Sequence, residues 1–428
     1  MIRKVFLSMM AVAVLAGTVQ TAQAQNADFW AVNVNGDTLY YTIIGNNEVS
    51  VSSTDDLDWR RLQLSGTLVI PSTVTHEGTP YTVTTIGSFG ECNYSALDLP
   101  STVTVLGQGC FSQCTTLTAV ILPPSVVEIQ QGAFTNCIAL TSVTIPNSVR
   151  TIGNYVFSGD TALRSVTLPD STALVGDAIF GGCHNLTQPV YNSTHFMFMP
   201  MDYSGEYTIP DGIQAVCGGV FEFCEDLTDI HFPASVETIG RNAFYGCTGL
   251  TSVVLPPHLL AVPENMFWGC TALRSVDITS NTLMRIGGCA FAGATALTRV
   301  TIKTALPPSV NSSSLPIAES TFDTLIVPCG AVQAYRNENY WNEIPVIEED
   351  CSVGIDGVDA INAKIYTNNG QIVVEGADCN TVTLYDLSGR HLATEQDYGT
   401  AIRFDVPASG TYMVKVGNHP ARKVVVIR

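Results

Sequence analysis

A 23-residue repeat runs through most of the 428-residue chain and limits the folds that it can adopt. Residues 140–162 (LTSVTIPNSVRTIGNYVFSGDTA) align position by position with 163–185, and 227–249 align in the same way with 250–272. The recurring phenylalanines that keep this register are Phe111, Phe134, Phe157, Phe180, Phe221, Phe244, Phe267 and Phe291. A unit this short cannot close its own core, so successive units must stack and share one, which predicts a solenoid.

Each repeat contains one alternating strand and a second, shorter apolar pair. In LTSVTIP, Val143 and Ile145 lie two residues apart, which is the period of a strand. Pro146 follows and ends the strand, because proline has no N–H with which to extend a ladder. Ile152 and Phe157 are five residues apart, which indicates a brief strand and then a helical turn. We predict a mostly β, leucine-rich-repeat-like solenoid of 23-residue rungs, with a parallel sheet and short helical turns.

The segments on either side of the repeats lose the 23-residue pattern. The predicted divisions are an N-terminal cap at 25–64, the solenoid at 65–324, a C-terminal cap at 325–350, a linker at 351–360 and a small antiparallel β-sandwich at 361–428. The C-terminal cap contains Tyr335, Tyr340 and Trp341, which can cover the open end of the last rung. The sandwich is predicted from short alternating runs with Asn369-Gly370 at a turn position.

The first 24 residues are predicted to be a signal peptide. Arg3 and Lys4 precede an apolar stretch from Val5 to Val19, and Ala22-Gln23-Ala24 offers a cleavage site before Gln25. An uncleaved membrane anchor is the alternative, and the short apolar stretch and the cleavage site argue against it. No later apolar run reaches the length of a membrane span, so we expect no transmembrane segment after signal removal.

The charge balance excludes one class of partner. The chain has 19 basic and 38 acidic residues, a formal net charge of −19, and it lacks the basic footprint that nucleic-acid binding requires. Residues 352–428 hold seven basic and eight acidic residues, so the acidity belongs to the repeat region. A partner that binds there through charge would be basic and would bind less well at high salt.

The blocks LTSVTIPNSVRTIGNYVFSGDTA and LTDIHFPASVETIGRNAFYGCTG resemble the BspA-type leucine-rich repeat of bacterial surface proteins. The resemblance extends over about residues 65–350 and includes a closing cap, LIVPCGAVQAYRNENYWNEI. It implies a secreted or cell-surface protein with an adhesin-like role, which binds protein or glycan ligands on host or microbial surfaces.

The tail resembles the C-terminal sorting domain of type IX secretion cargo. Its matching segments are VTLYD with a following Gly-Arg pair, PASGTYMVKV, and a lysine before the last strand. The matching residues are Tyr385, Asp386, Gly389, Arg390, Gly410, Tyr412 and Lys423. This resemblance implies recognition by the type IX machinery of a Gram-negative cell, then removal of the tail or its replacement by an anchor. A plain β-sandwich module, such as a carbohydrate binder, is the alternative.

Cysteines recur in one column of the repeat, at Cys92, Cys114, Cys137, Cys183, Cys224, Cys247 and Cys270. They can form a ladder of small buried thiols or disulfides between adjacent rungs. We favour thiols, because side chains in a ladder point the same way rather than at each other. Cys329 and Cys351 lie outside the column and could join across the cap. A zinc site is disfavoured, since no CxxC pair exists.

We find no catalytic constellation. The chain has no GxSxG, HExxH or P-loop motif, and Cys183, next to His184, belongs to the structural column. Asp55, Asp56 and Asp58 lack the spacing of a calcium loop. We therefore expect neither an enzyme nor a bound cofactor or metal.

The outward positions of the first strand of each rung form our candidate binding face. They are Ala96, Asp98, Ala119, Ile121, Ser142, Thr144, Ser165, Thr167, Glu206, Thr208, Asp229, His231, Ser252, Val254, Ser275, Asp277, Arg299 and Thr301. Such a face suits an extended partner. Two functions stay open: a binding protein that uses this face, and a structural surface or matrix protein without a specific ligand.

An insertion at 186–203 interrupts the repeat. Phe196, Met197, Phe198 and Met199 lie in a run that could expose one alternating pair as a hydrophobic patch. The same run could instead form an extra core strand of a long rung, which we favour.

Overall fold

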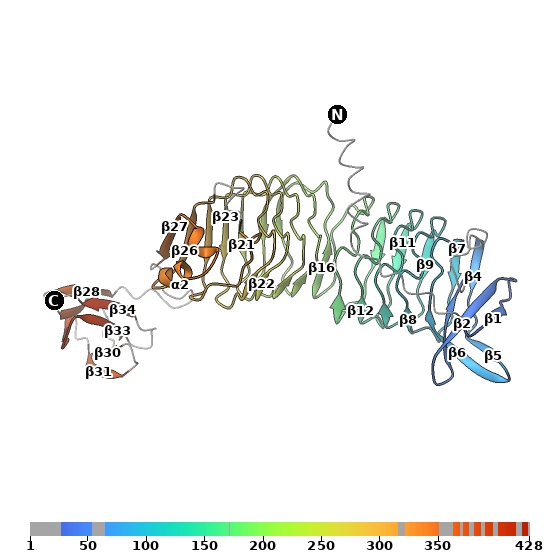
Figure 1. Cartoon of the computed structure of the whole chain (residues 1–428), viewed down its shortest axis with the longest axis horizontal. Helices are drawn as coiled ribbons and strands as arrows, with labels where there is room; N and C mark the ends of the chain where they lie inside the picture. The colour runs from blue at the N-terminus through green and yellow to red at the C-terminus, as the bar shows by residue number, and fades with distance from the viewer. Residues whose placement is uncertain are drawn as a thin grey trace, which may run out of the picture. The chain divides into compact units, whose positions relative to one another are not determined.

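A computed structural model describes residues 27–53, 65–170, 172–315 and 322–350, and within the C-terminal part 363–368, 371–375, 381–386, 390–396, 401–416 and 422–426. The chain divides into two compact units, Met1–Glu349 and Asp350–Arg428. The first unit is a solenoid of stacked rungs and the second is a small antiparallel β unit (Figure 1).

The first strands of the rungs lie side by side on one surface, which we call the main sheet (Figure 1). These strands are β4 (Ser65–Val69), β7 (Asn93–Asp98), β9 (Ala119–Ile121), β11 (Ser142–Thr144), β13 (Ser165–Thr167), β17 (Gly205–Thr208), β19 (Leu227–His231), β21 (Ser252–Leu255), β23 (Ser275–Ile278) and β25 (Arg299–Ile302). They pair in parallel in the groups β4–β7, β9–β11–β13, β17–β19 and β21–β23–β25. β26 (Thr324–Pro328) and β27 (Val346–Asp350) extend the last group.

The second strands of the rungs, most of them short, form the opposite layer. They are β6 (Thr79–Ile86), β8 (Val105–Leu106), β10 (Glu128–Ile129), β12 (Thr151–Ile152), β14 (Leu174–Val175), β16 (His195–Phe198), β18 (Ala215–Val216), β20 (Thr238–Ile239), β22 (Ala261–Val262) and β24 (Arg285–Ile286). They pair in parallel in the groups β6–β8–β10–β12–β14, β16–β18–β20 and β22–β24, with Ile129 beside both Leu106 and Ile152. The predicted solenoid of parallel strands is confirmed, and the segments expected to be short helical turns are hydrogen-bonded turns, such as those at 131–136 and 154–159.

The phenylalanine column forms a stack of rings inside the solenoid, with one interruption. Phe134 and Phe157 are typical, with ring centroids 5.4 Å apart and planes at 5°. The stack is interrupted at the insertion, where Phe180 contacts Phe198 edge to face, with ring centroids 6.4 Å apart. It resumes with Phe196, which stacks on Phe221 at 5.6 Å. Each ring thus covers its neighbours in the adjacent rungs, which explains why this position is held by one residue type.

The cysteine column lies beside this stack and contributes hydrogen bonds between rungs. The thiol of Cys137 donates to the carbonyl of Phe111 at 3.1 Å, and that of Cys270 donates to the carbonyl of Phe244 at 3.1 Å. Both cysteines are buried and not disulfide-bonded, so the prediction of a thiol ladder is confirmed at these positions. Cys329, after β26, is disulfide-bonded, and Cys351 lies outside the described residues.

Each end of the solenoid is covered. At the start, β1 (Phe29–Val32), β2 (Thr38–Gly45) and β3 (Glu48–Ser52) form an antiparallel meander that joins β6. β5 (Thr73–His76) pairs antiparallel with β6. At the far end, α2 (Val332–Arg336) and the 3₁₀ turn η2 (Trp341–Glu343) bring Tyr335 and Trp341 into the core.

Two hydrogen bonds fasten this C-terminal cap to the last rung. The indole N–H of Trp341 donates to the carbonyl of Pro308 at 2.9 Å, and the hydroxyl of Tyr335 donates to the carbonyl of Thr304 at 3.0 Å. Tyr340, the third aromatic residue of the predicted cap, stays 36% exposed.

The insertion contributes a core strand rather than a surface patch. β16 pairs antiparallel with β15 (Val190–Tyr191) and parallel with β18. All four candidate patch residues are buried; they are Phe196, Met197, Phe198 and Met199. The favoured alternative, an extra core strand, is therefore confirmed, and the exposed hydrophobic patch does not form, because both faces of β16 lie within the core of the long rung.

The C-terminal unit consists of two antiparallel sheets. One contains β28 (Lys364–Asn368), β29 (Gln371–Glu375) and β32 (Ile402–Asp405); the other contains β30 (Thr381–Asp386), β31 (His391–Gln396), β33 (Gly410–Val416) and β34 (Arg422–Val426). Ile372 and Phe404 of the first sheet share one apolar core with Leu384 and Val414 of the second. This agrees with the predicted antiparallel β-sandwich.

Candidate functional site

The outward residues of the main sheet are mostly accessible. Those exposed are Asp98, Ala119, Ile121, Thr144, Ser165, Thr167, Glu206, Thr208, His231, Val254 and Arg299, and those half-buried are Ala96, Ser142, Asp229, Ser252, Ser275 and Asp277. Thr301 was predicted to face outward, and this prediction is wrong, because its side chain is only 6% exposed. It lies between Asp277 and Ile326 in the register of its neighbouring strands.

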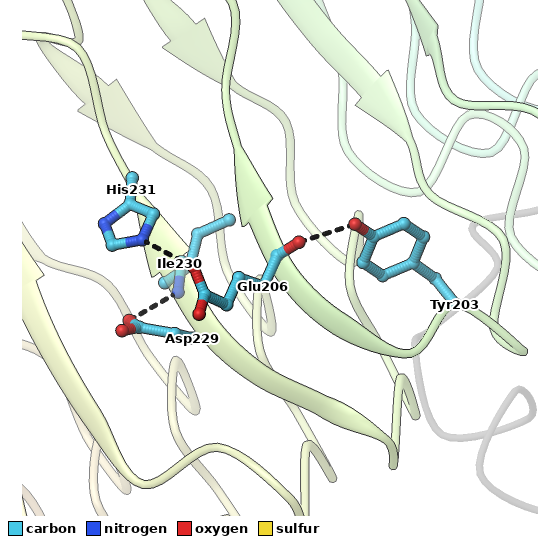
Figure 2. Close-up of polar contacts among 5 residues, drawn as sticks. All are labelled: Tyr203, Glu206, Asp229, Ile230 and His231. Carbon is cyan, nitrogen blue, oxygen red and sulfur yellow. Dashed lines mark hydrogen bonds and ion pairs between the residues drawn. The ribbon is translucent and has the colours of Figure 1, made fainter.

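Two carboxylates and one histidine meet where β17 runs beside β19. The parallel register places Glu206 opposite Asp229, and Thr208 opposite His231. Figure 2 shows the side chains of Glu206 and His231 directed toward each other, with Nε2 and Oε2 3.7 Å apart. Both side chains are exposed, at 75% and 51%, so solvent screens their mutual attraction and leaves them available to a partner.

The backbone around this cluster is held by local hydrogen bonds (Figure 2). The hydroxyl of Tyr203 donates to the carbonyl of Glu206 at 2.6 Å. Oδ1 of Asp229 accepts the N–H of Ile230 at 2.7 Å, which turns this carboxylate along its own strand. Glu206, Asp229 and His231 were all identified as candidates from the sequence alternation, and the structure brings these three together.

An apolar cleft of about 350 Å³ opens next to the cluster, where β19 and β21 lie side by side without a ladder between them. Asp229, His231 and Val254 line it, and the lining also includes Phe232 and Pro256. The alternation of the strands could not identify the last two residues, because they follow the strands rather than lie within them. The consecutive prolines after β21 were the sequence feature that could have indicated this cleft.

The cluster does not have the composition of a metal centre. Among the residues that the structure describes, no three His, Cys, Asp or Glu side chains cluster as metal ligands would. The described part of the chain also contains no helix with the length and apolar character needed to cross a membrane. What the cluster presents is negative charge beside an apolar hollow.

The sorting-type residues are partly described. Tyr385 and Asp386 end β30, and Asp386 accepts two hydrogen bonds from Arg390, each of 3.0 Å, one from the side-chain Nε and one from the backbone N–H. These contacts join the end of β30 to the residue before β31 and account for the Asp-to-Arg spacing. Gly389 lies outside the described residues.

The remaining sorting-type residues lie on the last two strands. Gly410 begins β33, and the hydroxyl of Tyr412 donates to the carbonyl of Ala408 at 2.9 Å. Lys423 lies in β34, opposite Met413. These three residues lie in the same sheet, and recognition by an export machinery stays a prediction.

Several solved structures are similar to the chain at low identity. The pneumococcal vaccine antigen PcpA is 16% identical, with a TM-score of 0.45 and a match covering 76% of this chain and 100% of that one. A leucine-rich cell surface protein from Faecalibacterium prausnitzii A2-165 is 22% identical, with a TM-score of 0.39, covering 76% and 95%. A leucine-rich repeat protein from Eubacterium ventriosum is 19% identical, with a TM-score of 0.43, covering 76% and 96%.

No curated protein matches the chain. A family profile does match: the BspA type leucine rich repeat region (6 copies) aligns with residues 83–201 and 194–313. These two segments together cover more than half of the chain and coincide with the rungs described above. The chain therefore belongs to the BspA-type leucine-rich repeat family.

Proposed function

We propose that this protein is a secreted or cell-surface leucine-rich repeat protein that binds a basic segment of a partner protein through its main sheet. The observation that carries the proposal is the cluster of Glu206, Asp229 and His231 at the mouth of the apolar cleft. The proposal includes no reaction and no cofactor.

A basic protein segment fits this surface for two reasons. The exposed carboxylate of Glu206 and the half-buried carboxylate of Asp229 attract a Lys or Arg side chain, and charge complementarity steers the encounter. The cleft between Ile230 and Leu255 accepts an apolar side chain next to that charge. An apolar anchor surrounded by polar contacts is the usual composition of a binding hot spot.

Two other partners or roles define the alternatives. A glycan ligand would use the same polar face. A structural or matrix protein would leave the face without a specific ligand.

A direct experiment is to probe an array of extracellular matrix proteins, microbial surface proteins and glycans with the purified protein. Binding to proteins with exposed basic segments, weakened by salt, is expected. Binding to glycans alone, or absence of any ligand at low salt, would rule the proposal out in favour of one of the alternatives.

A charge reversal on the main sheet tests whether the binding depends on this site. Glu206→Arg is expected to weaken binding several-fold, because it places a positive charge where the basic segment docks. Glu237→Arg makes the same change at an exposed position next to β20, in the opposite layer, and is the matched control. Equal losses from the two variants would show that net charge, and not this site, drives the binding.

We also propose that the C-terminal unit directs the protein to the surface of a Gram-negative cell through type IX secretion. The support is the resemblance of Tyr385, Asp386, Arg390 and Tyr412 to that family's motifs. Mass spectrometry of protein from its native cells, combined with surface labelling, tests this. We expect a surface-labelled protein that begins at Gln25 and lacks the tail after about residue 350. A periplasmic protein that retains its tail would instead favour an ordinary sandwich module.

A further inference from the structure

We propose that the break in the main sheet between β13 and β17 is an acceptor site for an extended peptide strand of a partner protein. The site is the exposed edge of β13 together with the facing segment 189–193. It lies on the same sheet as the proposed basic-segment site but is formed by other residues.

Pro189 explains why the sheet breaks here. It occupies the repeat position held by Val143 and Val166, which lie inside strands β11 and β13. Proline cannot donate to a ladder, so the insertion rung does not continue the sheet. The chain instead turns through β15 to pair antiparallel with β16.

The hydrogen bonds between rungs show the same interruption. In ordinary rungs the residue before the strand donates its N–H to the preceding rung, as Arg164 does to the carbonyl of Thr141 at 3.0 Å. Within the described part of the chain, Thr187 makes no equivalent bond to Arg164. β13 accordingly pairs with one described strand, β11.

The edge of β13 therefore offers backbone groups for a new strand. In a parallel ladder, alternate residues bond to opposite neighbours. The carbonyl of Thr167 accepts the N–H of Ile145 at 2.9 Å, on the β11 side. Val166 therefore directs its N–H and carbonyl to the open side, and so does the N–H of Leu168. Such an edge is the template for strand addition.

A cleft of about 460 Å³ adjoins this edge and can accept side chains. Val166, Leu168 and Val190 line it together with Tyr191, which is 45% exposed. Ser193 closes one end, because its hydroxyl donates to the carbonyl of Asp170 at 2.6 Å. The space is therefore bounded by a strand edge on one side and by apolar side chains on the other.

An aromatic cluster continues from this cleft to β17. The ring of Tyr191 stacks on Phe196 at 5.6 Å, and Phe196 lies 5.6 Å from Tyr207 of β17. Burial, with the nearby phenols of Tyr191 and Tyr203, raises the pKa of Tyr207 to about 12. Tyrosines grouped in this way supply contact area and hydrogen bonds to peptide ligands with little loss of side-chain entropy.

An extended peptide is the occupant that matches both features. Its backbone would pair with Val166 and Leu168, and alternate side chains would enter the cleft, since successive side chains of a strand point to opposite faces. A sugar would leave the strand edge unpaired, and a helix has no free backbone groups to offer it. Asp170, at the closed end, favours a peptide with a basic residue at that end.

The test starts from a phage-displayed library of random peptides selected on the full chain. Synthetic copies of the enriched peptides are then measured by fluorescence anisotropy against the wild type and two variants. Tyr191→Ala removes the wall of the cleft, and Tyr155→Ala is its matched control, because Tyr155 is 46% exposed and lies outside the cleft. We expect Tyr191→Ala to weaken binding about tenfold and Tyr155→Ala to leave it unchanged.

A backbone measurement distinguishes strand addition from other binding. We expect the bound peptide to slow amide hydrogen exchange of Val166 and Leu168, and Pro189→Val to weaken its binding by allowing the chain's own strand to pair. Failure to enrich any peptide, equal binding to Tyr191→Ala, or unchanged exchange at Val166 overturns the inference. Because Glu206 and His231 lie outside this cleft, such a failure leaves the proposed basic-segment site to its own test.

Discussion

The side chain of Asp160 accepts the backbone N–H of Cys137 through Oδ1, at 2.7 Å, from the neighbouring rung. Asp160 occupies the position that Cys137 and Cys183 hold in their own rungs, and it is fully buried. Its second oxygen, Oδ2, makes no hydrogen bond within the described residues. Burial raises the pKa of Asp160 to about 9, against the lowering effect of the Cys137 N–H. This carboxyl therefore holds its proton at neutral pH.

The first prediction concerns this proton. An unfolded chain releases the Asp160 proton above about pH 4, whereas the folded protein keeps it until about pH 9, so Asp160 makes stability fall as pH rises between these values. The slope is at most about 1.4 kcal/mol per pH unit. Asp160→Cys restores the column residue and removes this slope, so its advantage over the wild type in free energy of unfolding should grow with pH.

Urea unfolding at several pH values between about 5 and about 8 checks the difference between variant and wild type. Asp170→Asn removes an exposed carboxylate from a nearby rung and should leave the slope as it is. An advantage of Asp160→Cys that does not change with pH would mean that Asp160 is ionised in the folded protein.

The second prediction tests the phenylalanine stack. Phe244 is fully buried and stacks on Phe221 at 4.9 Å and on Phe267 at 5.6 Å. Phe244→Ala should lower the free energy of unfolding by about 3–5 kcal/mol, because it leaves a cavity between two rungs. Phe223 is half-buried and touches Tyr245 edge to face, so Phe223→Ala should cost only about 1 kcal/mol. Urea titrations measure both losses. Equal losses of unfolding free energy in the two variants would contradict a core that depends on the phenylalanine stack.

The third prediction concerns thiol reactivity. Burial raises the pKa of Cys114 and of Cys270 to about 12, so neither is a thiolate at neutral pH. Cys289 is only half-buried. N-ethylmaleimide followed by peptide mass spectrometry should label Cys289 in the folded protein, and should label Cys114 and Cys270 only after denaturation. Early labelling of Cys270 would show that the ladder opens in the native state.

The rungs could be predicted because a solenoid places each repeat position against the same position of the next rung. Residues that share a repeat position, such as Phe134 and Phe157, can therefore be predicted to contact each other across adjacent rungs. The insertion could not be settled in this way, since it has no counterpart in the other rungs. Whether Phe196 or Met197 faced solvent depended on β15 and on the neighbouring rungs, which cover β16 on both faces.

The candidate site was predictable in part. Strand alternation identified Glu206 and His231, because outward positions follow the period of two. It could not identify the clefts, which depend on where adjacent strands fail to pair. The sequence shows Pro189 at a repeat position that valine holds in other rungs. The open edge on β13 that results could not be predicted, because it depends on the path of the chain after Pro189.

The most direct test of the central claim is whether blocking the cleft beside Glu206 and His231 abolishes binding of a basic protein ligand identified on the array. Val254 and Leu260 are exposed to the same extent, 56% and 57%, and only Val254 lines the cleft. Biolayer interferometry with Val254→Arg and Leu260→Arg compares them. The account predicts that Val254→Arg loses binding while Leu260→Arg binds as the wild type does. Wild-type affinity in Val254→Arg, with both variants folded, would contradict it.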